Sequence, residues 1–208
     1  MVVRKNIPID LMSSGVAVLI EPADPPEAVS ISQEELHGLL NPPFNVVQGP
    51  GILSITSQRD QVQVQVSSNK IDVQDQSGDL GHGQRTVPEV LHGFWGLMKE
   101  PQTHSYGVNF ILKVSMAGPE QWIGSHLLAK KAAAGNKPSS PLVAVKLRKP
   151  PKEWTVRFEA SGQDSIVVNF NASENGDGDL LSQDALAKEI AAQYGLMEEY
   201  LQSIGLSK

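Results

Sequence analysis

Short segments with strand periodicity alternate with amphipathic helical segments along this chain. The clearest strand is Gln61–Ser67, where valine takes every second position and glutamine the positions between, so that one face is apolar and the other polar. A helix start is predicted at Ser32–Glu35, because its S-x-x-E spacing satisfies the first backbone donors of a helix that reaches about Leu40. Both periodicities recur throughout, and the sequence therefore predicts an α+β protein.

The first half of the chain predicts the order strand, helix, three strands, helix. The strands are expected at Ser14–Glu21, Gly51–Ser57, Gln61–Ser67 and Lys70–Gln74, and the helices at Ser32–Leu40 and from Thr86 to about Met98. The second of these helices has its own capping box at Thr86–Glu89, and Pro88 lies near its start.

The second half of the chain predicts the same order of elements. Here the strands are expected at Ser105–Val114, Leu142–Arg148, Glu153–Ala160 and Ser165–Ala172, and the helices at Pro119–Ala133 and Ser182–Ser203. The two halves therefore read as one unit used twice.

Local sequence similarity points to the same duplication. Trp95–Met98 reads WGLM and Tyr194–Met197 reads YGLM, an offset of 99 positions, while Gly15 and Gly107 open matching strands at an offset of 92. The loops of the second half absorb the difference. We expect residues 1–100 and 101–208 to form two related repeats that pack as one pseudo-symmetric body; the alternative is a chance match between amphipathic helices.

Short connections between successive strands favour an antiparallel sheet with helices on one face. The other face is predicted to be polar, with Gln61, Gln63, Gln65, Lys146, Arg148, Thr155, Arg157, Asn169 and Asn171. The core side is predicted to hold Trp154, Val156, Phe158, Ile166, Val168 and Phe170. In its order of elements alone, this arrangement resembles the duplicated saddle of TATA-binding-protein-like folds, and fold does not imply function.

Composition narrows the class of protein. The 208 residues include no cysteine, which excludes disulfides, thiolate metal sites and cysteine nucleophiles. No apolar run reaches the roughly 18–20 residues of a membrane span. Arg4 and Lys5 precede an apolar stretch, but Asp10 interrupts it and no cleavage pattern follows, so we expect a cytoplasmic protein without a membrane partner.

Candidate chemistry is sparse. His82 and Arg85 lie in a glycine-rich stretch that we expect to be a loop before the helix at Thr86, where an anion could bind; a plain connector is the alternative. His104 could join them at the junction of the halves. No zinc, nucleotide or nucleophile motif occurs, and Asn175–Asp179 fits a calcium loop poorly, so no metal and no cofactor are expected, and catalytic residues remain unassigned.

Charge is distributed unevenly along the chain. The whole chain has 23 acidic and 17 basic residues, a net charge of −6, yet residues 130–152 contain seven basic residues and no acidic one. The candidate polyanion-binding residues are Lys130, Lys131, Lys146, Arg148, Lys149 and Lys152, with Lys137 in the same strip. The alternatives are protection of a strand edge or pairing with acidic residues of the protein itself.

These observations favour a non-catalytic interaction or assembly protein built from two related halves, with a protein partner or self-association. An enzyme or small-ligand binder with a site between the halves is the first alternative. Binding of nucleic acid or another polyanion through the basic strip is the second.

Overall fold

The structure, a computed structural model, describes residues 7–20, 31–98, 101–128, 142–149 and 152–206. The first half has β1 (Ile9–Ile20), α1 (Gln33–Leu39), β2 (Phe44–Gly49), β3 (Ile52–Ser57), β4 (Val62–Ser67), β5 (Lys70–Asp75) and α2 (Leu80–Gly96). The second half has β6 (Thr103–Ser115), α3 (Pro119–His126), β7 (Leu142–Lys149), β8 (Lys152–Ser161), β9 (Ser165–Gly178) and α5 (Gln183–Ser203).

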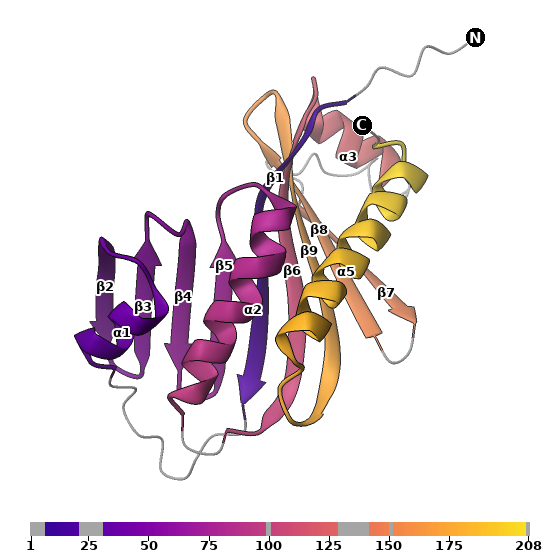
Figure 1. Ribbon diagram of the computed structural model, residues 1–208. Coiled ribbons are helices and arrows are strands. Elements are labelled where there is room, and N and C mark those ends of the chain that lie inside the picture. Colours follow the sequence, from indigo (N-terminus) through magenta and orange to yellow (C-terminus); the bar gives the residue numbers. More distant parts are fainter. Residues whose placement is uncertain (1–6, 21–30, 99–100, 129–141, 150–151, 207–208) are drawn as a thin grey trace.

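The nine strands within these ranges form a single sheet in the order β2-β3-β4-β5-β1-β6-β9-β8-β7, and every neighbouring pair is antiparallel. The first strand of each half, β1 and β6, lies at the centre (Figure 1). Among the described strands, the edges are β2 on one side and β7 on the other.

The helices lie on one face of this sheet, where α2 and α5 pack against each other (Figure 1). Beneath them the strands contribute alternate apolar residues, among which Val16, Val64, Phe110, Phe158 and Val168 are almost fully buried. From α2 and α5, Leu91, Phe94, Leu186, Ile190 and Met197 complete the core. Because successive side chains of a strand point to opposite faces of the sheet, this alternation makes one face apolar and the other polar.

The fold class is thus confirmed as α+β with a large antiparallel sheet and helices on one face. Two predictions were wrong in detail. β2 was not expected, and α2 begins at Leu80, so the stretch predicted to be a loop is helical. Within the described ranges, no helix is long and apolar enough to span a bilayer.

Candidate functional site: two polar clusters on the helical face

The first cluster lies where β5 leads into α2. Asp79 caps the helix, since its Oδ1 accepts hydrogen bonds from the backbone N–H groups of Gly81 at 2.8 Å and His82 at 3.4 Å. His82 and Arg85 therefore lie on the first turns of a helix and not in a loop. The glycines suggested a loop, but one acidic cap and the sheet beneath outweigh their poor helix propensity.

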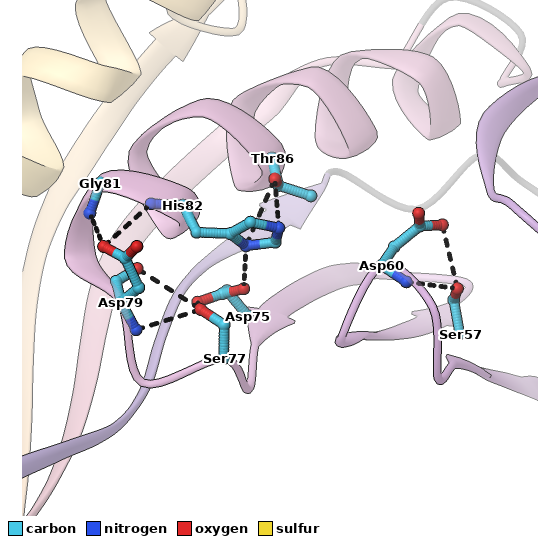
Figure 2. Close-up of polar contacts among 8 residues, drawn as sticks. All are labelled: Ser57, Asp60, Asp75, Ser77, Asp79, Gly81, His82 and Thr86. Carbon is cyan, nitrogen blue, oxygen red and sulfur yellow. Dashed lines mark hydrogen bonds and ion pairs between the residues drawn. The ribbon is translucent and has the colours of Figure 1, made fainter.

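At the centre of this cluster, the buried carboxylate of Asp75 contacts His82 (Figure 2). The distance from Asp75 Oδ1 to His82 Nδ1 is 2.6 Å, and Asp75 Oδ2 accepts a hydrogen bond from the Ser77 hydroxyl at 2.7 Å. The aspartate is completely buried, whereas 30% of the His82 side chain is exposed. Asp75 thus fixes the proton on Nδ1 and directs Nε2 away from itself, an arrangement known from catalytic and metal-binding histidines.

A nucleophile for this pair is missing among the described neighbours. Thr86 Oγ1 lies 3.5 Å from both ring nitrogens of His82. A hydroxyl activated by Nε2 would lie along the lone pair of that atom, much nearer to it than to Nδ1. The geometry therefore gives no hydrolytic triad.

Ser14 forms the inner wall of the first cluster. It lies opposite Asp75 in the β1–β5 ladder, is completely buried, and its hydroxyl has no hydrogen-bond partner among the described residues. A Cβ added to Gly83 would lie 2.1 Å from Ser14 Oγ, so α2 can approach β1 this closely only with glycine there.

The second cluster lies between α5 and strands β6, β8 and β9. Lys152 is in contact with the carboxylates of both Glu174 and Glu189, and only 21% of its side chain is exposed. Tyr106 donates a hydrogen bond to Glu174 at 2.8 Å. Burial, followed by this hydrogen bond and the nearby carboxylates, raises the pKa of Tyr106, so its hydroxyl stays protonated and continues to donate.

Hydrogen bonds extend this second cluster into the core. Gln193, which is 2% exposed, donates to Glu189 at 2.8 Å and accepts from the Trp154 ring N–H at 2.8 Å. The polar groups joined in this network all have partners, which is the condition under which buried polar side chains stabilise a fold.

The structure separates His104 from the other two predicted ligand residues. His82 and Arg85 share the start of α2, where Arg85 is exposed. His104 is exposed at the start of β6, beside the Leu19–Ile20 end of β1, while Asp75 and His82 lie at the Ser14 level. Five residues of strand separate these levels, about 17 Å. His104 therefore does not join the His82 cluster.

Basic residues of the strip 130–152 form ion pairs with acidic residues that lie outside that range. Lys146 and Arg148 pair with Glu153 at 3.5 and 2.8 Å, which lowers the pKa of Glu153, chiefly through Arg148. Lys152 belongs to the second cluster. Lys130, Lys131 and Lys137 lie outside the described residues, as does the Lys149 side chain. These contacts favour the internal-pairing alternative, and polyanion binding stays a prediction.

A small cavity lies beneath α5. Its volume of about 30 Å³ suits a single water, and its wall comes from Ile9, Leu112, Tyr194, Glu198, Leu201, Gln202 and Leu206. It does not open towards His82, Arg85 or His104. Over the described ranges, no group of three or more His, Asp or Glu residues is arranged to hold a metal ion.

A third polar group, around Asp60, fixes the connection between α1 and β2. Asp60 accepts hydrogen bonds from the backbone N–H of Asn41 at 2.7 Å, from its side-chain amide at 2.8 Å and from the Ser57 hydroxyl at 2.9 Å (Figure 2 shows the contact with Ser57). Partial desolvation raises the pKa of Asp60, but these hydrogen bonds outweigh it, and the net pKa is lowered.

The lowered pKa of Asp60 predicts a loss of stability in acid. Because the unfolded chain takes up this proton more readily, the stabilisation is complete above the unfolded pKa of about 3.9 and is lost as pH falls through the folded value. We expect Asp60→Asn to reduce the difference in unfolding free energy between pH 6 and pH 3 by less than about 1 kcal/mol. Urea unfolding at both pH values measures this. Glu199→Gln, at an exposed position on α5, is the control, and an equal change in both variants would contradict the assignment.

Sequence reasoning found His82 and Lys152 but missed their carboxylate partners. Asp75, Ser77 and Asp79 form a visible alternating pattern before α2, typical of a capping turn, and could have suggested a partner for His82. Glu174 and Glu189 gave no signal because they lie far from Lys152 in sequence.

Comparison with known proteins adds no assignment: no protein-family model matches the sequence, and no curated protein matches it significantly.

Proposed function

We propose that this chain is a non-catalytic interaction protein that binds a protein partner across the uncovered face of its sheet. Among the described residues, no helix packs on that face (Figure 1). The single observation that carries the proposal is a row of mostly uncharged polar residues that crosses the sheet from edge to edge.

The row is defined by the strand register. Residues directly opposite one another, strand after strand, are Asn45, Thr56, Gln63, Gln74, Gly15, Asn109, Asn171, Thr155 and Lys146. We call these nine residues the polar row. At about 4.8 Å between strands, it is about 38 Å long. Lys146 at the β7 edge is its only charged member.

This composition fits a protein partner better than water or a polyanion. Solvated surfaces are usually rich in lysine and glutamate, whereas the cores of interfaces are depleted in charge. Amide side chains offer both donors and acceptors, which suits the peptide groups and neutral side chains of another protein. Phosphate groups would call for arginine and lysine, and the row has no aromatic side chain on which a base could stack.

We further propose that the platform arose by internal duplication, and the sheet register supports this. Val16 pairs with Val108 at the same 92-residue offset as Gly15 and Gly107, so an axis through this central pair would exchange β1 with β6 residue by residue. In the next strands, Val16 pairs with Val73 and Val108 pairs with Ala172, which gives an offset of 99.

The long helices give the same offset of 99. The buried residues Val87, Leu91 and Phe94 of α2 correspond to the buried Leu186, Ile190 and Gln193 of α5. The pair β5 and β9 and the pair α2 and α5 thus have the same offset in residue number, as expected for two copies of one unit. The polar clusters correspond as well. Asp75, which lies opposite Ser14, matches Glu174, which lies opposite Tyr106. Among the described residues, β2 has no counterpart in the second half.

The two glycines have equivalent surroundings. A Cβ on Gly15 would lie 2.5 Å from the Val73 carbonyl oxygen, and a Cβ on Gly107 would lie 3.2 Å from that of Ala172. A fused pair of related units supplies in one chain the symmetric body that a homodimer would otherwise form.

Charge placed on the polar row tests the proposal. We expect Gln63→Arg to reduce the amount of protein partner that co-purifies from the native cells at least about tenfold, because the added charge would have to be desolvated in the middle of a mostly uncharged row. Gln202→Arg makes the same change at an exposed position near the end of α5 and is expected to have no effect. Equal retention by both variants, with unfolding free energies matched to the wild type, would overturn the proposal.

One observation supports the alternative, an enzyme or small-ligand binder: the Asp75-oriented imidazole of His82 at the surface. In that case a small ligand would bind the wild type and not His82→Ala, while Gln63→Arg would bind it normally.

A further inference from the structure

The two edges of the sheet differ in charge. At the β7 edge, Lys146 and Arg148 have side chains that are 67% and 73% exposed. Charged side chains of this kind prevent one sheet edge from pairing with another. At the β2 edge the strand itself and its hairpin carry no such protection, because residues 36–58 include no aspartate, glutamate, lysine or arginine.

Apolar side chains are exposed at the same unprotected edge. Val46 is 45% exposed, Val47 is 68% exposed, and Ile52 on the adjacent strand β3 is 46% exposed. Val46 lies on the helical face of the sheet, since it pairs with the buried Ile55, whereas Val47 lies on the opposite face. A strand added beside β2 would cover apolar surface on both faces.

The hairpin turn determines which backbone groups of β2 point outwards. Gly49 and Ile52 flank the two-residue turn of Pro50 and Gly51, whose φ of 71° is the left-handed conformation that glycine supplies. The residues that flank such a turn form a hydrogen-bonded pair, and such pairs then alternate along the hairpin. The N–H and C=O groups of the residues between, Phe44, Val46 and Gln48, therefore point away from β3.

Building on the proposed role as an interaction protein, we propose that β2 pairs antiparallel with β2 of a second copy of this chain, about a two-fold axis at Val46. Val46 then lies opposite its own equivalent, and Phe44 lies opposite Gln48 of the other copy. The outward groups of these three residues match one another and form six backbone hydrogen bonds. Pro43 and Pro50 mark the two ends of the paired segment, since proline cannot continue a ladder.

The uncharged, self-complementary pattern of β2 favours a second copy as the occupant. Two chains of net charge −6 repel each other overall, but β2 offers a self-complementary contact in which no charged side chain faces its equivalent. The charged β7 edge resists the same pairing, so association ends at a closed dimer and does not continue into a fibre. One short strand per copy buries little area, and we expect a dissociation constant of about 1–100 μM.

Sedimentation equilibrium of the full chain tests this pairing. We expect the wild type to dimerise and Val46→Lys to raise the dissociation constant at least about 100-fold, since two lysines would meet at the axis. Leu142→Lys is the control: Leu142 is a 61% exposed apolar residue on the other edge, opposite Glu159, and its replacement should leave the dimer intact.

Amide hydrogen exchange gives a second measurement that needs no variant. The amides of Phe44, Val46 and Gln48 should exchange more slowly as protein concentration rises through the dissociation constant. A wild type that stays monomeric to about 500 μM, or a dimer that survives Val46→Lys, would overturn the β2 pairing. Neither result bears on partner binding across the polar row, which the Gln63→Arg comparison tests separately.

Discussion

Replacing Asp75 with alanine is expected to lower the free energy of unfolding by about 2–4 kcal/mol. The carboxylate is completely buried and accepts hydrogen bonds from both His82 and Ser77. Its loss leaves these two groups without their acceptor and removes the link between β5 and the start of α2. Urea denaturation at neutral pH measures the change.

The control for this prediction is Asp10→Ala, at an exposed position of β1, which should change stability by no more than about 0.5 kcal/mol. The double variant Asp75→Ala/His82→Ala should cost less than the sum of the single variants, because both remove the same contact. Residues selected for catalysis often reduce stability, and their replacement can increase it. An unchanged or raised stability in Asp75→Ala would therefore favour the ligand-binding alternative.

Replacing Lys152 with alanine is expected to cost a similar amount, about 2–4 kcal/mol. Its ammonium group lies between the carboxylates of Glu174 and Glu189, whose side chains are only 23% and 17% exposed. Without Lys152, two partly buried negative charges remain without their shared cation. Thermal or urea unfolding of the purified variant measures the loss.

Lys146→Ala is the matched comparison, because Lys146 is 67% exposed and its ion pair with Glu153 lies at the surface. Exposed pairs contribute at most about 1 kcal/mol, so this variant should unfold close to the wild type. If instead both variants were stable and both bound a polyanion more weakly than the wild type, whose own affinity fell as salt was raised, the basic strip would be a binding surface and not part of the scaffold.

The strands were predictable where one face is buried. Alternation at Val62, Val64 and Val66 is the direct consequence of a sheet with one apolar face, and the structure places all three in the core. The edge strand β2 escaped prediction for the opposite reason. Val46 and Val47 are both exposed, so no alternation marks the strand.

The start of α2 shows where local signals fail. Gly83 is unfavourable in a helix taken alone, but the contact with Ser14 on the distant strand β1 requires it. That requirement comes from tertiary structure and leaves no mark in local sequence. The order of helices and strands within each half, apart from β2, could be predicted from the sequence, because hydrophobic periodicity marks each segment without any knowledge of its contacts.

The partners in the polar clusters could not be predicted either, because they too are brought together only by tertiary structure. Tyr106 and Glu174 are 68 residues apart, and Lys152 and Glu189 are 37 apart, so only the strand register and the packing of α5 bring them together. The polar row likewise exists only once the register of nine strands is known. The sequence predicted polar strand faces, and the fold joins them into one continuous surface.

A native mass spectrum of the untagged protein, purified gently from its own cells, tests the central claim most directly. If the chain is an interaction protein, we expect masses larger than that of the 22.4 kDa monomer, from either a complex with another polypeptide or a multiple of the chain. A monomer carrying one discrete small ligand would contradict the claim and direct attention to His82.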